Sequence, residues 1–121
     1  MKSPPSLSLA DHRLLDLVWS SEPISSPQLC KLAQAQLGWK RTTTYTVIKK
    51  CMAKGAIERS EPNFMCHALI PKEVVQEAEA EELIGKLFDG SPDKLFAALL
   101  DNQKLSREQI ENLRRMVAEL E

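Results

Sequence analysis

Hydroxyl-bearing and basic side chains are concentrated in one short stretch near the middle of the chain. Each of them can donate hydrogen bonds, and a threonine methyl group can also contact the methyl group of thymine. Arginine and lysine attract phosphate, and arginine can form two parallel hydrogen bonds with guanine. The set is therefore suited to binding nucleic acid, and it consists of Lys40, Arg41, Thr42, Thr43, Tyr45, Thr46, Lys49 and Lys50.

Different roles are expected within this stretch. Base edges should be read mainly by Thr42, Thr43 and Thr46, while Arg41, Lys49 and Lys50 should anchor the chain on phosphate. Lys40 can hold the DNA backbone, and Tyr45 can contact a phosphate or a sugar. Two residues of a later segment can also approach phosphate, namely Arg59 and His67.

The net charge of −1 argues against a nucleic-acid-binding protein, but the charges are segregated along the chain. Seven basic residues and one acid lie between Lys31 and Arg59, whereas twelve acids and seven basic residues follow from Lys72 onward. A basic middle and an acidic C-terminal part are expected when one segment faces phosphates and another does not.

Three helices are predicted in the first half. Ser8 and Asp11 form a capping-box pattern, so the first helix should begin there and end in the segment 20–25, which contains a proline. Ser26 followed by Pro27 predicts the start of the second helix, which covers 28–37 and ends at Gly38. The third helix is expected over about 41–54, with Gly55 after it.

A β-hairpin should follow the third helix. Segments 56–59 and 65–69 have strand character, and they flank Glu61-Pro62-Asn63, where asparagine tolerates a positive φ angle. Three helices and a hairpin make a winged helix-turn-helix unit. We therefore predict a mainly α-helical fold with a small β-hairpin, in which residues 1–71 form a winged-helix DNA-binding domain.

Residues 72–121 are predicted to form a helical dimerisation region. A helix should run from Pro71 to about Leu87, a short one should start at Ser91-Pro92, and Ser106 with Gln109 should cap the last. Their apolar stripes need a partner, since such short helices are not stable alone. We expect a second copy of the chain to contact Leu83, Leu87, Leu95, Phe96, Leu99, Ile110, Leu113 and Val117.

Several other functions are disfavoured by the residues present. The three cysteines, Cys30, Cys51 and Cys66, are widely spaced and lack a C-x-x-C pair, which argues against a disulfide framework or a zinc site. Alternation along a strand should send Cys66 and His67 to opposite faces, so no metal is expected there. Burial is expected for Cys51.

Catalysis is not expected either. We find no phosphate loop and no nucleophile with an evident base, so neither an enzyme nor a cofactor is expected.

Membrane insertion is also not expected. No apolar run approaches the roughly 20 residues that cross a bilayer, and the first residues lack the apolar stretch of a secretory signal. We expect a cytoplasmic protein.

Short matches to a known family occur in order along nearly the whole chain. They are Leu7-Ser8 with Asp11, Val18-Trp19, the stretch from Trp39 to Ile57 that includes Lys54-Gly55-Ala56, and Leu105-Ser106 with Ile110 and Leu113. In this order, and in its length, the chain resembles the penicillinase repressor and methicillin-resistance regulator family, to which copper-responsive repressors are related.

The resemblance implies a homodimeric winged-helix repressor on a palindromic double-stranded DNA operator, with the third helix in the major groove. It also implies a membrane sensor-protease system as a partner, which triggers cleavage of an Asn-Phe bond in the antibiotic-resistance members. The corresponding positions here hold Ala98 and Leu99, so that cut does not carry over. Copper sensing by C-terminal cysteines does not carry over either, because no cysteine follows Cys66.

A second interpretation stays open at this point. The net acidity and a hairpin turn without basic residues permit a winged-helix module that binds a protein partner and not DNA. Binding of DNA at low salt distinguishes the two.

Overall fold

The fold is taken from a computed structural model that describes residues 5–120. The chain divides into two compact units, one up to Ala78 and one from Glu79 onward, and helix α4 (Lys72–Leu87) contributes to both. The predicted fold class is confirmed: helices predominate, a small antiparallel sheet forms the wing, and further helices follow. The domain boundary proposed between residues 71 and 72 stays a prediction.

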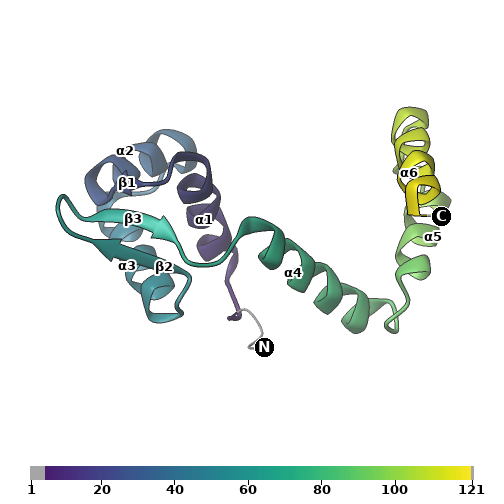
Figure 1. The fold of residues 1–121 in the computed structure, drawn as a ribbon, viewed down its shortest axis with the longest axis horizontal. Helices are drawn as coiled ribbons and strands as arrows, with labels where there is room; N and C mark the ends of the chain where they lie inside the picture. The colour runs from purple at the N-terminus through teal and green to yellow at the C-terminus, as the bar shows by residue number, and fades with distance from the viewer. Residues whose placement is uncertain (1–4, 121) are drawn as a thin grey trace. The chain divides into compact units, whose positions relative to one another are not determined.

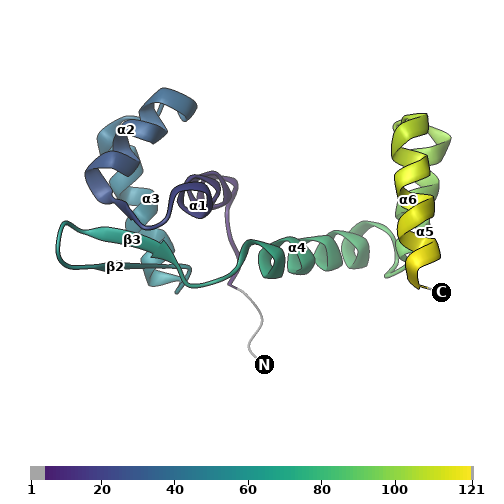
Figure 2. The ribbon, with the colours of Figure 1, turned by 45° about the horizontal axis from the view of Figure 1, so that its top comes forward.

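The first unit contains helices α1 (Leu9–Ser21), α2 (Ser26–Leu37) and α3 (Arg41–Ala53), followed by strands β2 (Ile57–Ser60) and β3 (Met65–Ala68). In both views the turn between β2 and β3 projects beyond the three helices (Figures 1 and 2). This is the arrangement of a winged helix-turn-helix unit, with the β2–β3 hairpin as the wing.

Local signals predicted the helix ends well. The amide of Asp11 donates to the Ser8 hydroxyl at 3.1 Å and the amide of Ser8 donates to the Asp11 carboxylate at 2.9 Å, so the capping box is confirmed. Gly38 ends α2 with φ +70°, a left-handed conformation that glycine adopts readily. Helix α3 ends at Ala53, one residue before the predicted end, and Lys54 is its C-cap.

The predicted cap of α2 is wrong by one residue. Ser25, not Ser26, accepts the hydrogen bond from the amide of Gln28, at 3.3 Å. Ser26 is the first helical residue and is buried, and its hydroxyl donates to the carbonyl oxygen of Phe64 at 3.1 Å. The Ser26 side chain therefore hydrogen-bonds to a residue that is distant in the sequence, and no local pattern predicts this partner.

The sheet has a strand that the sequence did not predict. Strand β1 (Ile24–Ser25) pairs antiparallel with β3, which lies between β1 and β2. The hairpin itself is shifted slightly, because β2 begins at Ile57 and β3 ends at Ala68, while Asn63 has the predicted positive φ, +68°. A two-residue strand forms only through its partner, so it has no periodic signal of its own.

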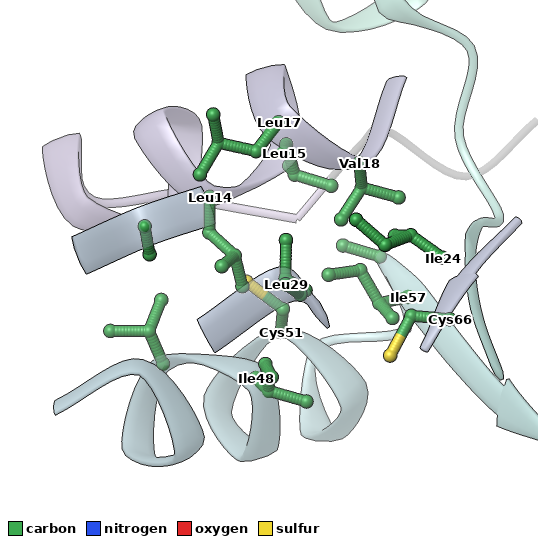
Figure 3. Packing of buried hydrophobic residues seen from close by; sticks show 13 residues of the cluster. Leu14, Leu15, Leu17, Val18, Ile24, Leu29, Ile48, Cys51, Ile57 and Cys66 are labelled. Carbon is green, nitrogen blue, oxygen red and sulfur yellow. The ribbon is translucent and has the colours of Figure 1, made fainter. Parts of the chain in front are cut away.

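The core of the first unit lies between the three helices and the sheet (Figure 3). Leu14, Leu15 and Val18 of α1 are fully buried, and they meet Leu29 of α2 and Ile48 of α3. The sheet closes this core with Ile24, Ile57 and Cys66. Helix α3 is therefore held against α1, α2 and the wing along one side only.

The second unit contains the end of α4 together with α5 (Pro92–Asp101) and α6 (Arg107–Leu120), and the latter two lie side by side (Figures 1 and 2). Mutual hydrogen bonds of 2.9 and 3.1 Å between Ser106 and Gln109 confirm the predicted capping box. Neither α5 nor α6 contains a buried residue in the described part of the chain. Residues 79–120 of this unit therefore do not enclose a core of their own.

Candidate nucleic-acid interface

Helix α3 has one buried and one exposed face. Its inward side chains, Thr44, Val47, Ile48 and Cys51, are buried in the core of the first unit. The predicted binding residues, here called the α3 patch, lie outside this buried set: Lys40, Arg41, Thr42, Thr43, Thr46, Lys49 and Lys50 are exposed and Tyr45 is half-buried. The structure thus brings these eight residues together on one helix and the residue that precedes it.

The first turn of α3 is open to a ligand. Lys40 is the N-cap residue and makes no side-chain capping hydrogen bond, so the N-cap leaves the first amides of the helix available to a ligand. Thr44 is buried, and its hydroxyl donates to the carbonyl of Lys40 at 3.3 Å. The exposed hydroxyl of Thr46 donates to the carbonyl of Thr42 at 2.9 Å and keeps its lone pairs free to accept. Free amides at a helix start favour an anion.

Arg41 is positioned by an aromatic ring. The carbon of its guanidinium group lies 5.6 Å from the centre of the Tyr45 ring, within the range of a cation–π interaction. Tyr45 also contacts α2: burial raises the pKa of the Cys30 thiol, while a hydrogen bond with Tyr45 and the charge of Arg41 act to lower it. Tyr45 therefore connects the start of α3 to the middle of α2.

Lys54 does not belong to the α3 patch. Its ammonium group lies 2.5 Å from a carboxylate oxygen of Asp11, a residue that is only 1% exposed. Burial on its own raises the pKa of Asp11, but hydrogen bonds with Lys54 and Ser8 outweigh it, and the pKa is lowered. Asp11 thereby fixes the C-terminal end of α3 to the start of α1.

Cys51 is the third member of this cluster. Its thiol donates to the other carboxylate oxygen of Asp11 at 3.6 Å, and the residue is fully buried, as predicted. Burial, followed by the charge of Asp11, raises the pKa of Cys51 to about 12. The thiol is therefore protonated at neutral pH and is not an activated nucleophile.

The two faces of the wing have different chemistry. Glu58 and His67 are paired across the strands, 3.1 Å apart. Arg59 is paired with Cys66 in the register, so it stands on the other face, and its guanidinium carbon lies 5.2 Å from the centre of the Phe64 ring. Arg59 and His67 were both expected to approach phosphate from the hairpin. For Arg59 this stays a prediction, whereas His67 is paired with Glu58 on the opposite face.

Cys66 and His67 also separate as alternation predicts. Cys66 is fully buried, and its thiol lies 3.5 Å from the Ser26 hydroxyl, while His67 is half-exposed. Among residues 5–120, no group of three or more potential ligands is arranged to hold a metal ion.

The side chains predicted to form the dimer interface are exposed or half-buried in the single chain. Leu83, Leu87, Phe96 and Val117 are between 42% and 65% exposed. The other four, Leu95, Leu99, Ile110 and Leu113, are half-buried. Between α5 and α6 lies an apolar groove of about 380 Å³, lined by Phe96, Leu100, Leu105, Ile110, Leu113, Arg114 and Val117.

Sequence reasoning missed two residues that matter for this interface. Asp11 was assigned only a capping role, although it shares a helical face with Leu14, Leu15 and Val18, a spacing that points to burial. Phe64 was not assigned any role, and its half exposure depends on the conformation of the hairpin turn.

The fold and the α3 patch together define a winged helix-turn-helix protein. The family model described as penicillinase repressor matches residues 7–119. The chain is 24% identical over 113 residues to the methicillin resistance regulatory protein MecI of Mammaliicoccus sciuri, a match that covers 92% of both proteins. It is 22% identical over 121 residues to the penicillinase repressor of Bacillus licheniformis, covering 98% of this chain and 94% of that protein.

The chain therefore belongs to the penicillinase repressor family, which confirms the resemblance. Members of this family are transcriptional regulators and not enzymes, so the chain is a transcriptional repressor. Within residues 5–120, no helix is both long and apolar enough to span a membrane.

Proposed function

We propose that the chain acts as a homodimer on a palindromic DNA operator, with α3 of each protomer in the major groove. The observation that carries this proposal is the α3 patch, an exposed basic and hydroxyl-rich surface on the second helix of a helix-turn-helix pair. A helix fits the major groove of B-DNA and reads base edges with residues near its N-terminus. The opposite face of α3 is anchored in the core, so the patch is presented on a rigid element.

Within the patch, position along the helix separates reading from anchoring. Thr42, Thr43 and Thr46 lie in the first turns, where short side chains approach base edges, and we assign them the reading of sequence. Arg41 is held over Tyr45 and can contact a guanine or a phosphate. Lys49 and Lys50 lie further along and are assigned phosphate contacts, to which Lys40 and Arg59 add.

Homodimer formation is supported by the second unit. Its helices α5 and α6 have an amphipathic pattern but leave apolar side chains exposed in the single chain, including Val117 at 56% exposure. A second copy placed against α5 and α6 removes this surface from water and stabilises helices that are too short to persist alone. Two protomers related by a two-fold axis match two half-sites of a palindrome.

Fluorescence anisotropy with a palindromic fragment of the protein's own promoter tests the proposal. Arg41→Ala and Thr43→Ala should each cost about 1–3 kcal/mol per half-site, so the dimer should bind at least about 30-fold more weakly. Arg13→Ala removes an exposed arginine from α1 and serves as the control, with unchanged affinity expected. Wild-type affinity in both α3 variants would refute the assignment of the recognition helix.

The alternative of a protein-binding module makes the opposite prediction for the wild-type chain. If no DNA fragment is bound even at low salt, where phosphate contacts are strongest, the DNA-binding proposal is wrong and the module is favoured.

A membrane sensor-protease system stays a proposal as a partner. The Ala98–Leu99 bond lies inside α5, and the Ala98 carbonyl accepts a hydrogen bond from the Asn102 side chain at 2.9 Å. A protease that cut this bond would first have to unwind α5, since proteases cleave most readily at exposed, open loops. Intact repressor after induction in cells would exclude inactivation by cleavage.

A further inference from the structure

Thr46 lies at the centre of the α3 patch. Side chains three and four positions apart are neighbours on the surface of a helix. Thr42 and Thr43 therefore flank Thr46 toward the start of α3. Lys49 and Lys50 flank it toward the end of the helix, and all four neighbours are exposed. With the lysines on phosphate and the first turns of α3 in the groove, the Thr46 side chain faces the base edges.

The hydroxyl proton of Thr46 is already used within the helix. It is donated to the carbonyl oxygen of Thr42, four residues back, at 2.9 Å. A hydroxyl group has a single proton to donate and two lone pairs that accept. While this bond is kept, the Thr46 oxygen can accept a hydrogen bond from DNA but has no proton to donate to it.

The other two reading threonines differ from Thr46 because of their place in the helix. The positions four residues before Thr42 and Thr43 lie ahead of the N-cap Lys40, so no carbonyl of α3 is placed there to accept their hydroxyl protons. Both hydroxyls can therefore donate to a base as well as accept from it. Thr44 does make the same kind of bond, to the carbonyl of Lys40 at 3.3 Å, but it is buried. Within α3, Thr46 is thus the exposed threonine whose hydroxyl is held as an acceptor.

The major groove of DNA presents donors and acceptors in a pattern that differs between bases. Guanine presents the acceptors N7 and O6 and thymine the acceptor O4, whereas adenine presents an amino group at N6 and cytosine an amino group at N4. Each base pair therefore presents one amino group. An oxygen that only accepts gains a hydrogen bond from this amino group. Against O6 or O4 it would place one acceptor beside another and leave both without a donor.

We infer that Thr46 determines specificity at one base pair of each half-site by accepting a hydrogen bond from the amino group of adenine or cytosine. This inference rests on the function proposed above and adds the class of base that Thr46 reads. Guanine and thymine are disfavoured at this contact, because O6 and O4 lie where a donor is required. The selectivity comes from the hydrogen bond inside α3, which directs the hydroxyl proton away from the DNA.

Selection of sequences by the full-length chain locates the contact. The library consists of palindromic fragments of its own promoter with randomised half-sites. Thr46→Val keeps the branched shape and a methyl group but removes the oxygen. The sequences that Thr46→Val selects should lose the preference at one position of each half-site, while the other positions keep theirs. Thr46→Ser retains the hydroxyl group and should restore the preference at this position.

Removing the amino group from the DNA at that position tests the chemistry. Purine replaces adenine, or pyrimidin-2-one replaces cytosine, so that only the exocyclic amino group is lost. The wild type should bind about fivefold more weakly per modified half-site, or about 25-fold more weakly when both half-sites are modified. Thr46→Val should bind the modified and unmodified fragments with affinities that agree within about twofold, because it has no oxygen to accept the bond.

Ser20→Ala is the matched control. The exposed Ser20 hydroxyl also donates to the carbonyl four residues back, that of Asp16, at 2.8 Å, but it belongs to α1. This variant should select the same sequences as the wild type and bind them with the same affinity. The inference is overturned if Thr46→Val selects the wild-type sequences, or if removal of the amino group affects the wild type and Thr46→Val equally. If thermal unfolding shows that Thr46→Val does not fold, Thr46→Ala decides by the same two measurements.

Failure of the underlying proposal gives a different result. A wild-type chain that binds no DNA overturns both the proposed function and the role of Thr46. A wild type that depends on Arg41 for binding but not on the Thr46 oxygen overturns only the class of base assigned to Thr46.

Discussion

Replacing Lys54 by methionine would leave the Asp11 carboxylate without its cation. Asp11 is 1% exposed, and Lys54 is the basic residue that lies 2.5 Å from it. Methionine keeps the length and apolar stem of lysine and removes only the charge and the hydrogen-bond donors. The substitution should therefore destabilise the first unit by leaving a buried carboxylate with the hydrogen bonds from Ser8 and Cys51 alone.

The expected magnitude follows from the exposure of the two partners. Removing one partner of a fully buried ion pair costs about 3–5 kcal/mol. The Lys54 side chain is 35% exposed, so water can replace part of its interaction with Asp11, and we expect about 2 kcal/mol. In a domain of this size that loss lowers the melting temperature by about 8–16 °C.

Lowering the pH should reduce the difference in stability between the wild type and Lys54→Met. The pKa of Asp11 in the folded wild type lies below its ordinary value of 3.8, so the pair contributes its stability above about pH 4, and the contribution is lost as pH falls through the lowered pKa. Lys54→Met removes the ammonium group that lowers the pKa of Asp11, while burial still raises it. The pKa of Asp11 should therefore be higher in this variant than in the wild type. The gap in stability between the two proteins should be largest near pH 7 and shrink toward pH 3.

Urea unfolding followed by circular dichroism at pH 7 and pH 3 measures this gap. Lys49→Met removes an exposed lysine from the same helix and should change the free energy of unfolding by no more than about 0.5 kcal/mol. Adding Asp11→Asn to Lys54→Met removes the unpaired charge and should recover part of the loss. The reasoning is refuted if Lys54→Met is as stable as Lys49→Met at pH 7, or if its deficit persists unchanged at pH 3.

Three further outcomes are expected. Because the pKa of Cys51 is raised to about 12, iodoacetamide at pH 8 should alkylate it only after unfolding; mass spectrometry that finds the adduct in folded protein would contradict its burial. Leu113→Asp places a charge in the apolar groove between α5 and α6 and should convert dimer to monomer in sedimentation velocity, whereas a persistent dimer would exclude this surface. Ser8→Ala removes the N-cap of α1 and should lower the free energy of unfolding by about 1 kcal/mol in a urea titration; an unchanged value would argue against the capping box.

Features with a local cause could be predicted from the sequence. The capping boxes at Ser8 and Ser106, the left-handed Gly38 and the positive φ of Asn63 each depend on neighbouring residues, and all are present. The apolar period of α3 likewise predicted which face would be buried, and therefore which residues would make up the α3 patch.

Features with a distant cause could not be predicted. Strand β1 exists because β3 pairs with it, and Ser26 is used by Phe64, 38 residues away, instead of by its own helix. The Asp11–Lys54 pair likewise spans 43 residues. Periodicity predicts which residues are inside, but only the packing of helices and sheet determines which partners meet there.

Hydroxyl-radical footprinting of the wild-type chain on its own promoter tests the central claim most directly. Two copies of α3 related by a two-fold axis should protect two half-sites centred about 10 base pairs, or a multiple of that, apart. The protection should vanish for Arg41→Ala at the same protein concentration. Protection without two-fold symmetry, or a symmetric footprint that Arg41→Ala leaves unchanged, would contradict a dimer that binds DNA through the exposed face of α3.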